Sequence, residues 1–143
     1  MMPTLRRLRD LPDFEVATGQ PDVRSWTVRG SDGKPLGRVY ELIIDPEALK
    51  VRYLDIELDA RNGRGSEETH ILLPIGVAGL DTEADNVFVP GLNQLTVKSY
   101  PPYVELQITR EYEEAMLRAL GKTSVEGDFY DRPSFDAGAF YTR

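Results

Sequence analysis

Short runs of β-prone residues, separated by turn residues, recur between positions 22 and 90 of this chain. The runs cover residues 26–28, 37–45, 51–58, 69–77 and 87–89. Short, regularly spaced strands with turn signals between them are typical of a small β-sandwich or barrel. We therefore predict a mainly β fold, a small barrel of five or six short antiparallel strands whose closure would leave no exposed strand edge.

Apolar and polar side chains alternate most clearly in the run that ends near residue 59. One face carries Leu54, Ile56 and Leu58, and the other carries Tyr53, Asp55, Glu57 and Asp59. Alternation with a period of two places one face on a core and the other in water. We therefore expect the three carboxylates to be solvated. The alternative, an acid–base site of paired carboxylates, requires burial that separates their pKa values.

The residues before and after the predicted barrel lack its regularly spaced β-prone runs. Residues 1–21 are expected to form an extended arm, with a short helical turn at 5–11, where leucines recur at three-residue spacing. The barrel itself is expected to span residues 22–91. Residues 92–143 are then expected to form a connector, a helix at about 109–120 and a C-terminal tail that packs on the barrel or on a partner.

The helix prediction depends on signals at both of its ends. Thr109 can accept a hydrogen bond as the N-cap, and acidic residues follow in the first turns, where the helix dipole favours them. Gly121 suits the position after the last turn.

Aromatic residues are concentrated in the tail. The five residues concerned are Phe129, Tyr130, Phe135, Phe140 and Tyr141. Each aromatic side chain buries a large area when it leaves water. The tail is therefore expected either to pack back over its own domain or to dock onto a partner or a second copy of the chain, and these five residues are the candidate partner-binding set.

Composition excludes several kinds of reactive site. The chain of 143 residues has no cysteine, which excludes disulfides, thiol nucleophiles and thiolate metal sites, and its one histidine, His70, excludes sites with two imidazoles. We interpret His70 as a surface or hydrogen-bonded residue, since no nucleophile motif accompanies it. The acidic loop at 81–86 lacks the central glycine and terminal glutamate of an EF-hand. We predict no catalytic residue, no enzyme activity, no cofactor and no metal site.

Charge and hydropathy narrow the choice of partners. The chain has 17 basic and 24 acidic residues and a net charge of −7, which disfavours nucleic acid, because nucleic-acid binding neutralises phosphates with Lys and Arg. The arginines at 6, 7 and 9 lie next to acidic residues, and we interpret them as a solvated face. No apolar run approaches the roughly 20 residues of a membrane helix, so we expect no membrane span and a cytoplasmic location.

With the strands placed, six blocks of residues resemble the PRC-barrel family in order and spacing. The blocks cover residues 22–28, 32–39, 45–46, 51–58, 70–76 and 87–90. Residues 107–114 and 136–141 further resemble the helix and tail of the cytoplasmic domain of the photosynthetic reaction centre H subunit. That subunit has an N-terminal membrane helix that is not found in these residues, so no functional residue is carried over from it.

We therefore expect a non-catalytic PRC-barrel protein that acts as a protein–protein binding or assembly module and forms a homodimer. The resemblance implies two alternatives. One is an accessory of electron or proton transfer in a photosynthetic reaction centre, and the other is an RNA-processing or ribosome-maturation accessory.

Overall fold

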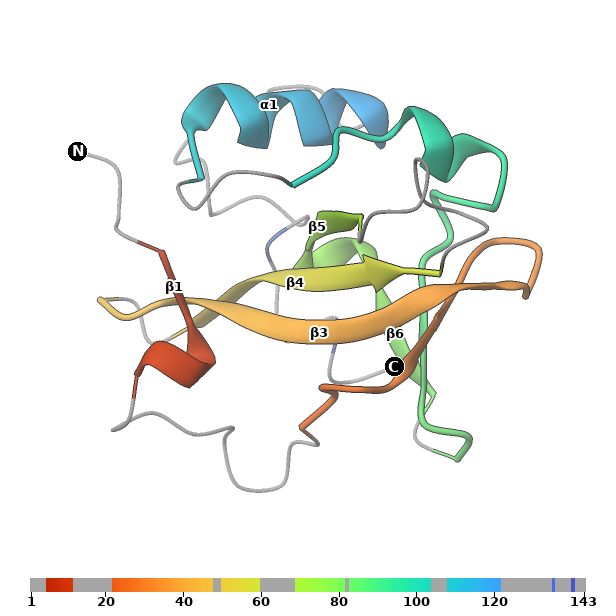
Figure 1. Ribbon diagram of the computed structural model, residues 1–143, viewed down its shortest axis with the longest axis horizontal. Helices are drawn as coiled ribbons and strands as arrows, with labels where there is room; N and C mark the ends of the chain where they lie inside the picture. Colours follow the sequence, from red (N-terminus) through yellow and green to blue (C-terminus); the bar gives the residue numbers. More distant parts are fainter. Residues whose placement is uncertain are drawn as a thin grey trace.

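The computed structural model describes most of the chain. The described residues are 5–11, 22–47, 50–59, 69–81, 83–103, 108–121, 135 and 140. In this part of the chain, strands form a single sheet and one α-helix lies over one of its faces (Figure 1).

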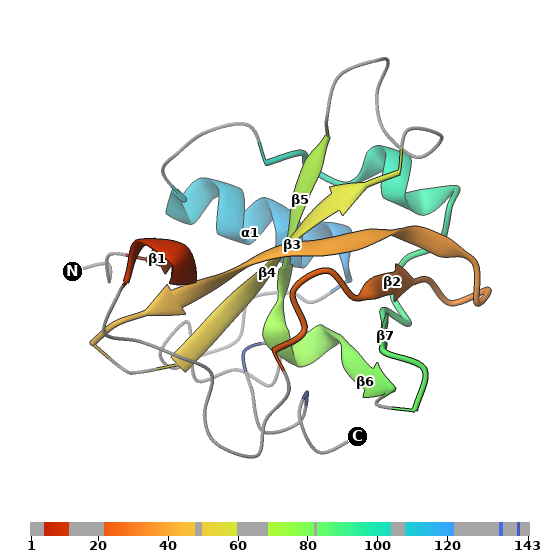
Figure 2. The ribbon, with the colours of Figure 1, turned by 60° about the horizontal axis from the view of Figure 1, so that its bottom comes forward.

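Seven strands make up the sheet. They are β1 (Arg6–Arg7), β2 (Thr27–Arg29), β3 (Pro35–Asp45), β4 (Lys50–Leu58), β5 (His70–Pro74), β6 (Gly79–Asp81) and β7 (Asn86–Phe88). Short 3-10 helices lie at η1 (Leu8–Asp10), η2 (Ile75–Val77) and η3 (Thr96–Ser99), and the α-helix is α1 (Arg110–Ala119). The strand order is β5-β4-β3-β2-β7-β6, and β1 pairs with β3 (Figure 2).

The mainly β fold is confirmed, but the details of the predicted barrel were wrong. The sheet has seven strands, the β2–β7 pair is parallel, and the described pairings run as an open path from β5 to β6. Two strands, β1 and β6, were missed because neither Arg6–Arg7 nor Gly79–Asp81 contains a β-branched or aromatic residue. The parallel pair was missed because side-chain alternation does not identify which distant strand becomes a neighbour.

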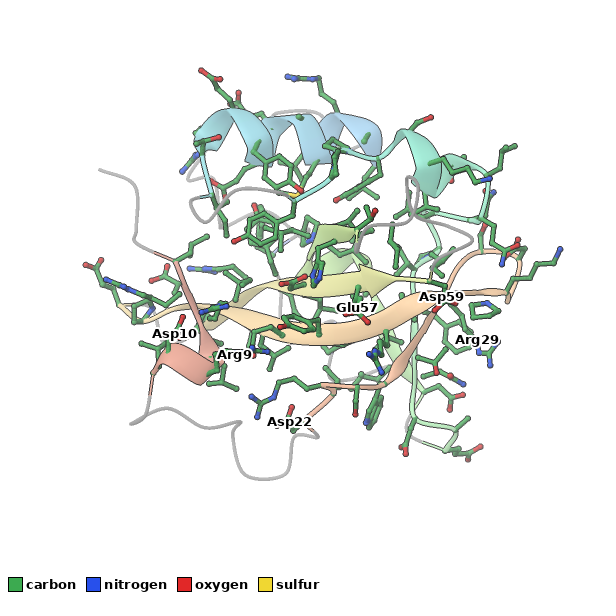
Figure 3. All side chains as sticks on the ribbon, viewed as in Figure 1. Arg9, Asp10, Asp22, Arg29, Glu57 and Asp59 are labelled. Carbon is green, nitrogen blue, oxygen red and sulfur yellow. The ribbon has the colours of Figure 1, made fainter. Side chains whose placement is uncertain are left out.

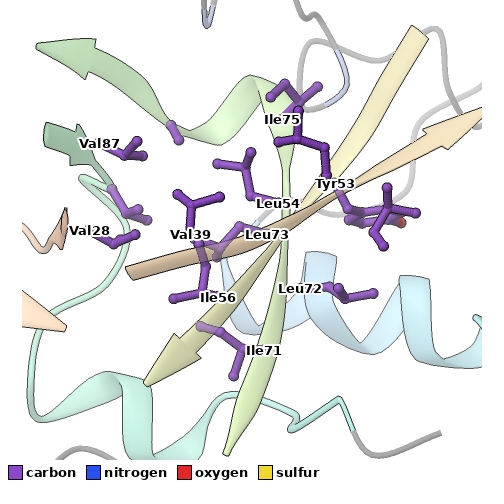
Figure 4. Packing of buried hydrophobic residues seen from close by; sticks show 14 of the residues in the cluster. Val28, Val39, Tyr53, Leu54, Ile56, Ile71, Leu72, Leu73, Ile75 and Val87 are labelled. Carbon is purple, nitrogen blue, oxygen red and sulfur yellow. The ribbon is translucent and has the colours of Figure 1, made fainter. Parts of the chain in front are cut away.

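The long strands β3 and β4 are buried on both faces. Every residue of β3 from Glu41 to Asp45 is buried, and so is every residue of β4 from Arg52 to Ile56. On one face, Leu54 and Ile56 point toward β2 and β7 (Figure 4). On the other face, α1 and the chain that precedes it cover the sheet (Figure 1).

The prediction that the carboxylates of β4 are solvated is therefore wrong for Asp55. Asp55 is only 3% exposed, and Tyr53 on the same face is fully buried. Glu57 is half-buried and Asp59 is exposed, as expected for the end of the strand. Alternation showed two different faces, but it could not show that a later helix covers the more polar one.

Helix α1 is fixed at its start and against the sheet. The Thr109 side chain accepts a hydrogen bond from the Tyr112 backbone N–H at 3.2 Å, which caps the helix. One turn later, the fully buried carboxylate of Glu113 accepts a hydrogen bond of 2.6 Å from the Tyr53 hydroxyl of β4. This buried polar contact, together with Met116 and Leu117, holds α1 to the sheet.

The described residues of the tail lie in the core of their own chain. Phe135 is 3% exposed and its ring meets the Tyr53 ring edge-on at 5.4 Å, and Phe140 is fully buried. These two rings are buried within their own chain, and the choice between the two alternatives for the tail stays a prediction. Phe129, Tyr130 and Tyr141 lie outside the described residues, and their contact with a partner stays a prediction.

Replacing Tyr53 with Phe tests the contact that holds α1. We expect Y53F to lower the free energy of unfolding by roughly 1–3 kcal/mol, because the fully buried carboxyl group of Glu113 loses this donor. Tyr100→Phe is the matched control, since this buried tyrosine donates instead to the neutral carbonyl of Leu72 at 2.6 Å. Urea unfolding should show the smaller loss, about 1 kcal/mol, for Y100F. Equal losses would contradict the conclusion that the Tyr53–Glu113 contact holds α1 in place.

Candidate functional site

A cavity of about 440 Å³ lies between the N-terminal arm and the sheet. Its lining comes from the arm, from β3, β4 and β5, and from the chain that leads into α1: Leu5, Arg6, Arg7, Asp10, Tyr40, Ile43, Asp55, His70, Tyr103 and Ile108. We call this cavity the arm groove. The pairing of β1 with β3, at Arg6↔Ile44 and Arg7↔Ile43, holds the arm beside the sheet.

The floor of the arm groove depends on a β-bulge in β3. Val39 pairs with Ile56 of β4, but the next pair is Glu41 with Asp55, so Tyr40 is an extra residue. A bulge of this kind re-aims side chains locally. The Tyr40 ring consequently meets the His70 ring edge-on at 4.8 Å, with an interplanar angle of 89°.

Asp55 and His70 form the central polar contact of the floor. They are diagonal neighbours on β4 and β5, and Nδ1 of His70 lies 2.7 Å from Oδ1 of Asp55. The side chains are 5% and 16% exposed. Burial raises the pKa of the Asp55 carboxyl above its usual value, and the hydrogen bond with His70 opposes part of that change.

Tyr103 closes the arm groove from the side of the connector. Its backbone N–H donates to the His70 carbonyl at 2.7 Å, and its ring stacks on Tyr112 with the centroids 6.1 Å apart. Burial raises the pKa of the Tyr103 hydroxyl, and the nearby Asp55 charge adds to the effect. The hydroxyl therefore stays protonated at neutral pH.

Ion pairs fasten the arm to the sheet. Arg9 Nε lies 2.6 Å from Oε2 of Glu41, a carboxylate that is 1% exposed, and Arg24 Nη1 lies 3.6 Å from Oε1 of the same group. The Arg9 guanidinium also lies over the Tyr40 ring, 4.6 Å from its centroid. A cation over an aromatic face adds to the electrostatic attachment.

At the end of the arm, Arg7 bonds to both oxygens of Asp10, at 2.9 and 3.3 Å. Figure 3 shows Arg9 and Asp10 side by side along β3. Of the three arginines that we interpreted as a solvated face, Arg7 and Arg9 make specific pairs while their side chains stay 42% and 40% exposed. Asp10 was the nearby sequence signal for the Arg7 pair, whereas Glu41, the partner of Arg9, lies 32 residues away.

Arg6 differs from the other two arginines of the arm. It is exposed and lines the arm groove, and its side chain makes no hydrogen bond or ion pair with any described residue. The acidic groups of the lining are already engaged, because Asp10 bonds to Arg7 and Asp55 bonds to His70. Arg6 is therefore the one charged side chain of the lining that has no hydrogen-bond partner among the described residues, although its charge acts on Asp10.

The described residues of the arm groove provide polar contacts, and they include part of one familiar catalytic arrangement. An imidazole held by a carboxylate is half of a hydrolytic triad, but no serine, threonine or cysteine is among the described residues that line the arm groove. The described residues also include no group of three or more acidic or histidine side chains that could hold a metal ion. No helix in the described part of the chain is long and apolar enough to cross a membrane.

Sequence reasoning identified part of this site. His70 was interpreted as a surface or hydrogen-bonded residue, and the structure places it in a hydrogen bond with Asp55. Asp55 itself was missed because it was assigned to solvent. Tyr40 was also missed, since a one-residue bulge leaves no mark in a run of β-prone residues. The position of Tyr53 on the same face as Asp55 was the available signal that this face was covered.

The raised pKa of Asp55 predicts a specific dependence of stability on pH. Above pH 3.8, the usual pKa of this group, the unfolded chain releases the proton that the folded protein retains. The contribution of Asp55 to stability is therefore greatest below pH 3.8 and falls as pH rises through the folded-state pKa. The free energies of unfolding of the wild type and of Asp55→Asn would be measured in urea at several pH values from acid to neutral. The wild-type value minus the D55N value should fall as the pH rises. A difference that rises would contradict the raised pKa.

A comparison with models of protein families matches residues 15–95 to the PRC-barrel domain. The match covers more than half of the chain and includes β2 through β7. A search of curated proteins finds no significant match. The domain match does not separate the branches of the family, so the likeness to the reaction centre H subunit stays a prediction. The chain belongs to the PRC-barrel family.

Proposed function

We propose that this protein is a non-catalytic module that works by protein–protein contact, and that its first partner is a second copy of itself. The observation that carries the proposal is a difference between the two edges of the sheet. Edge strands expose backbone groups that can pair with another chain, and proteins usually cover them. Here one edge is bonded to the connector, and the other makes no backbone hydrogen bond with the described residues beyond its pairing in the sheet.

The covered edge is β5. The His70 carbonyl accepts from the Tyr103 backbone N–H at 2.7 Å, and the Leu72 carbonyl accepts from the Tyr100 hydroxyl at 2.6 Å. These bonds occupy the side of β5 that faces away from β4. A further strand therefore cannot be added at β5 without removing the connector.

The open edge is β6, at the outer end of the sheet (Figure 2). It pairs with β7 on one side. Its other side makes no backbone hydrogen bond with the described residues and is open in this sense, while Gly79 and Leu80 are buried and Asp81 is partly exposed. Phe88 of β7 is 38% exposed and lies opposite Gly79 of β6. An aromatic side chain next to an open strand edge is suited to strand addition, in which backbone bonds supply affinity and a side chain supplies specificity.

A second candidate function rests on the Asp55–His70 pair. A buried carboxyl group with a raised pKa, bonded to an imidazole at the floor of a cavity, is suited to holding and passing a proton. This supports an accessory role in proton transfer, which the likeness to the H subunit also implies. Copurification with a photosynthetic reaction centre from the native source would support it, and absence of any such complex would contradict it.

Substitution of Phe88 tests the open edge. We expect the wild type to self-associate, and Phe88→Lys to raise the dissociation constant at least about tenfold, because a charge beside an edge strand opposes pairing. Leu95→Lys is the matched control, since Leu95 is 77% exposed and lies outside β6 and β7. Analytical ultracentrifugation would measure both. A monomeric wild type at high micromolar concentration, or an equal effect of L95K, would overturn the proposal.

A further inference from the structure

The arm groove has the size and the lining of a small-molecule site. Its volume of about 440 Å³ falls within the range of roughly 300–1,000 Å³ that is usual for such sites. Apolar side chains from three different segments line it, namely Leu5, Ile43 and Ile108. Sites for small ligands combine such a lining with a few polar groups in fixed positions.

The two tyrosine rings of the lining are held in place without a ligand. Tyr40 is fixed by its edge contact with His70 and by Arg9, which lies over the ring and donates from Nη1 to the hydroxyl at 3.3 Å. Tyr103 is fixed by its stacking on Tyr112. Preformed aromatic walls reduce the ordering cost of binding a flat or branched apolar group.

The charges of the lining select the sign of the ligand. Each carboxylate is already bonded to a guanidinium or an imidazole. The charged group left without a hydrogen bond to a described residue is the Arg6 guanidinium. The hydrogen bond from Arg7 and, to a lesser degree, the charge of Arg6 lower the pKa of Asp10. A ligand amine would have to compete with Arg7 for Asp10 or with His70 for Asp55. A ligand carboxylate needs no such exchange, because a guanidinium presents a fork of donors that matches it.

We infer that the arm groove binds a small monocarboxylate with an aromatic or branched aliphatic body, whose carboxylate is held by Arg6. The body lies against Ile43, Ile108 and the two tyrosine rings. A second carboxylate on the ligand would face Asp10 or Asp55, so a dicarboxylate is disfavoured. This site is separate from β6, and it is independent of the self-association proposed above.

Phenylacetate is the probe for the test, and an NMR titration of the full chain measures its binding. We expect saturable binding at millimolar concentrations, weakened about tenfold by Arg6→Gln, because a charge-assisted hydrogen bond is lost. Arg6→Lys keeps the charge and should retain part of the affinity. Arg118→Gln is the matched control, since it removes the same charge from an exposed position at the end of α1 and should leave binding unchanged.

Comparison ligands separate the two parts of the inference. Phenylethanol and phenylethylamine keep the ring without the carboxylate, and acetate keeps the carboxylate without the ring. All three should bind more weakly than phenylacetate. Absence of saturable phenylacetate binding, equal binding of phenylethanol, or no effect of R6Q would each overturn the inference. Binding of an acidic peptide with no binding of phenylacetate would also overturn it, because the arm groove would then be a surface for a protein segment.

Discussion

The antiparallel pairing of β3 with β4 is the interaction on which the rest of the structure depends. These are the two longest strands, and their pairing runs from Gly37↔Leu58 to Asp45↔Lys50. β4 carries β5 on its other edge, while β3 carries both β2 and the arm strand β1. Both faces of this pair are buried. The hydrophobic core between β3, β4, β2 and β7 therefore packs on one face of the same two strands, and α1 packs on the other.

The cover over the second face makes α1 part of the domain rather than an appendage. The Tyr53 hydroxyl and the Glu113 carboxylate meet where neither is exposed. A buried carboxylate is costly unless it is bonded, so this contact favours a single placement of the helix. The same cover removes Asp55 from water and raises its pKa, and it thereby changes an ordinary strand carboxylate into the centre of the arm groove.

Local sequence signals predicted the bounds of helices and strands better than they predicted which residues pack against them. The runs at 37–45 and 51–58 lie within two residues of β3 and β4, because β-branched and alternating residues are concentrated there. The helix prediction was similarly close, because Thr109 and Gly121 act through local backbone geometry. What covers β4, by contrast, depends on residues that are distant in sequence. Neither the burial of Asp55 nor its contact with His70 could follow from the period of a single strand.

The bulge at Tyr40 has a consequence for how such a site arises. Before the bulge, Val39 shares the face of Ile56, and after it Glu41 shares the opposite face with Asp55, so one added residue inverts the phase of β3. Tyr40 and Glu41 are then both available to the arm, through Arg9. Because Glu41 already lies opposite Asp55, deletion of Tyr40 alone would leave a regular ladder and remove one wall of the floor, so this wall depends on the length of β3 rather than on the character of its other residues.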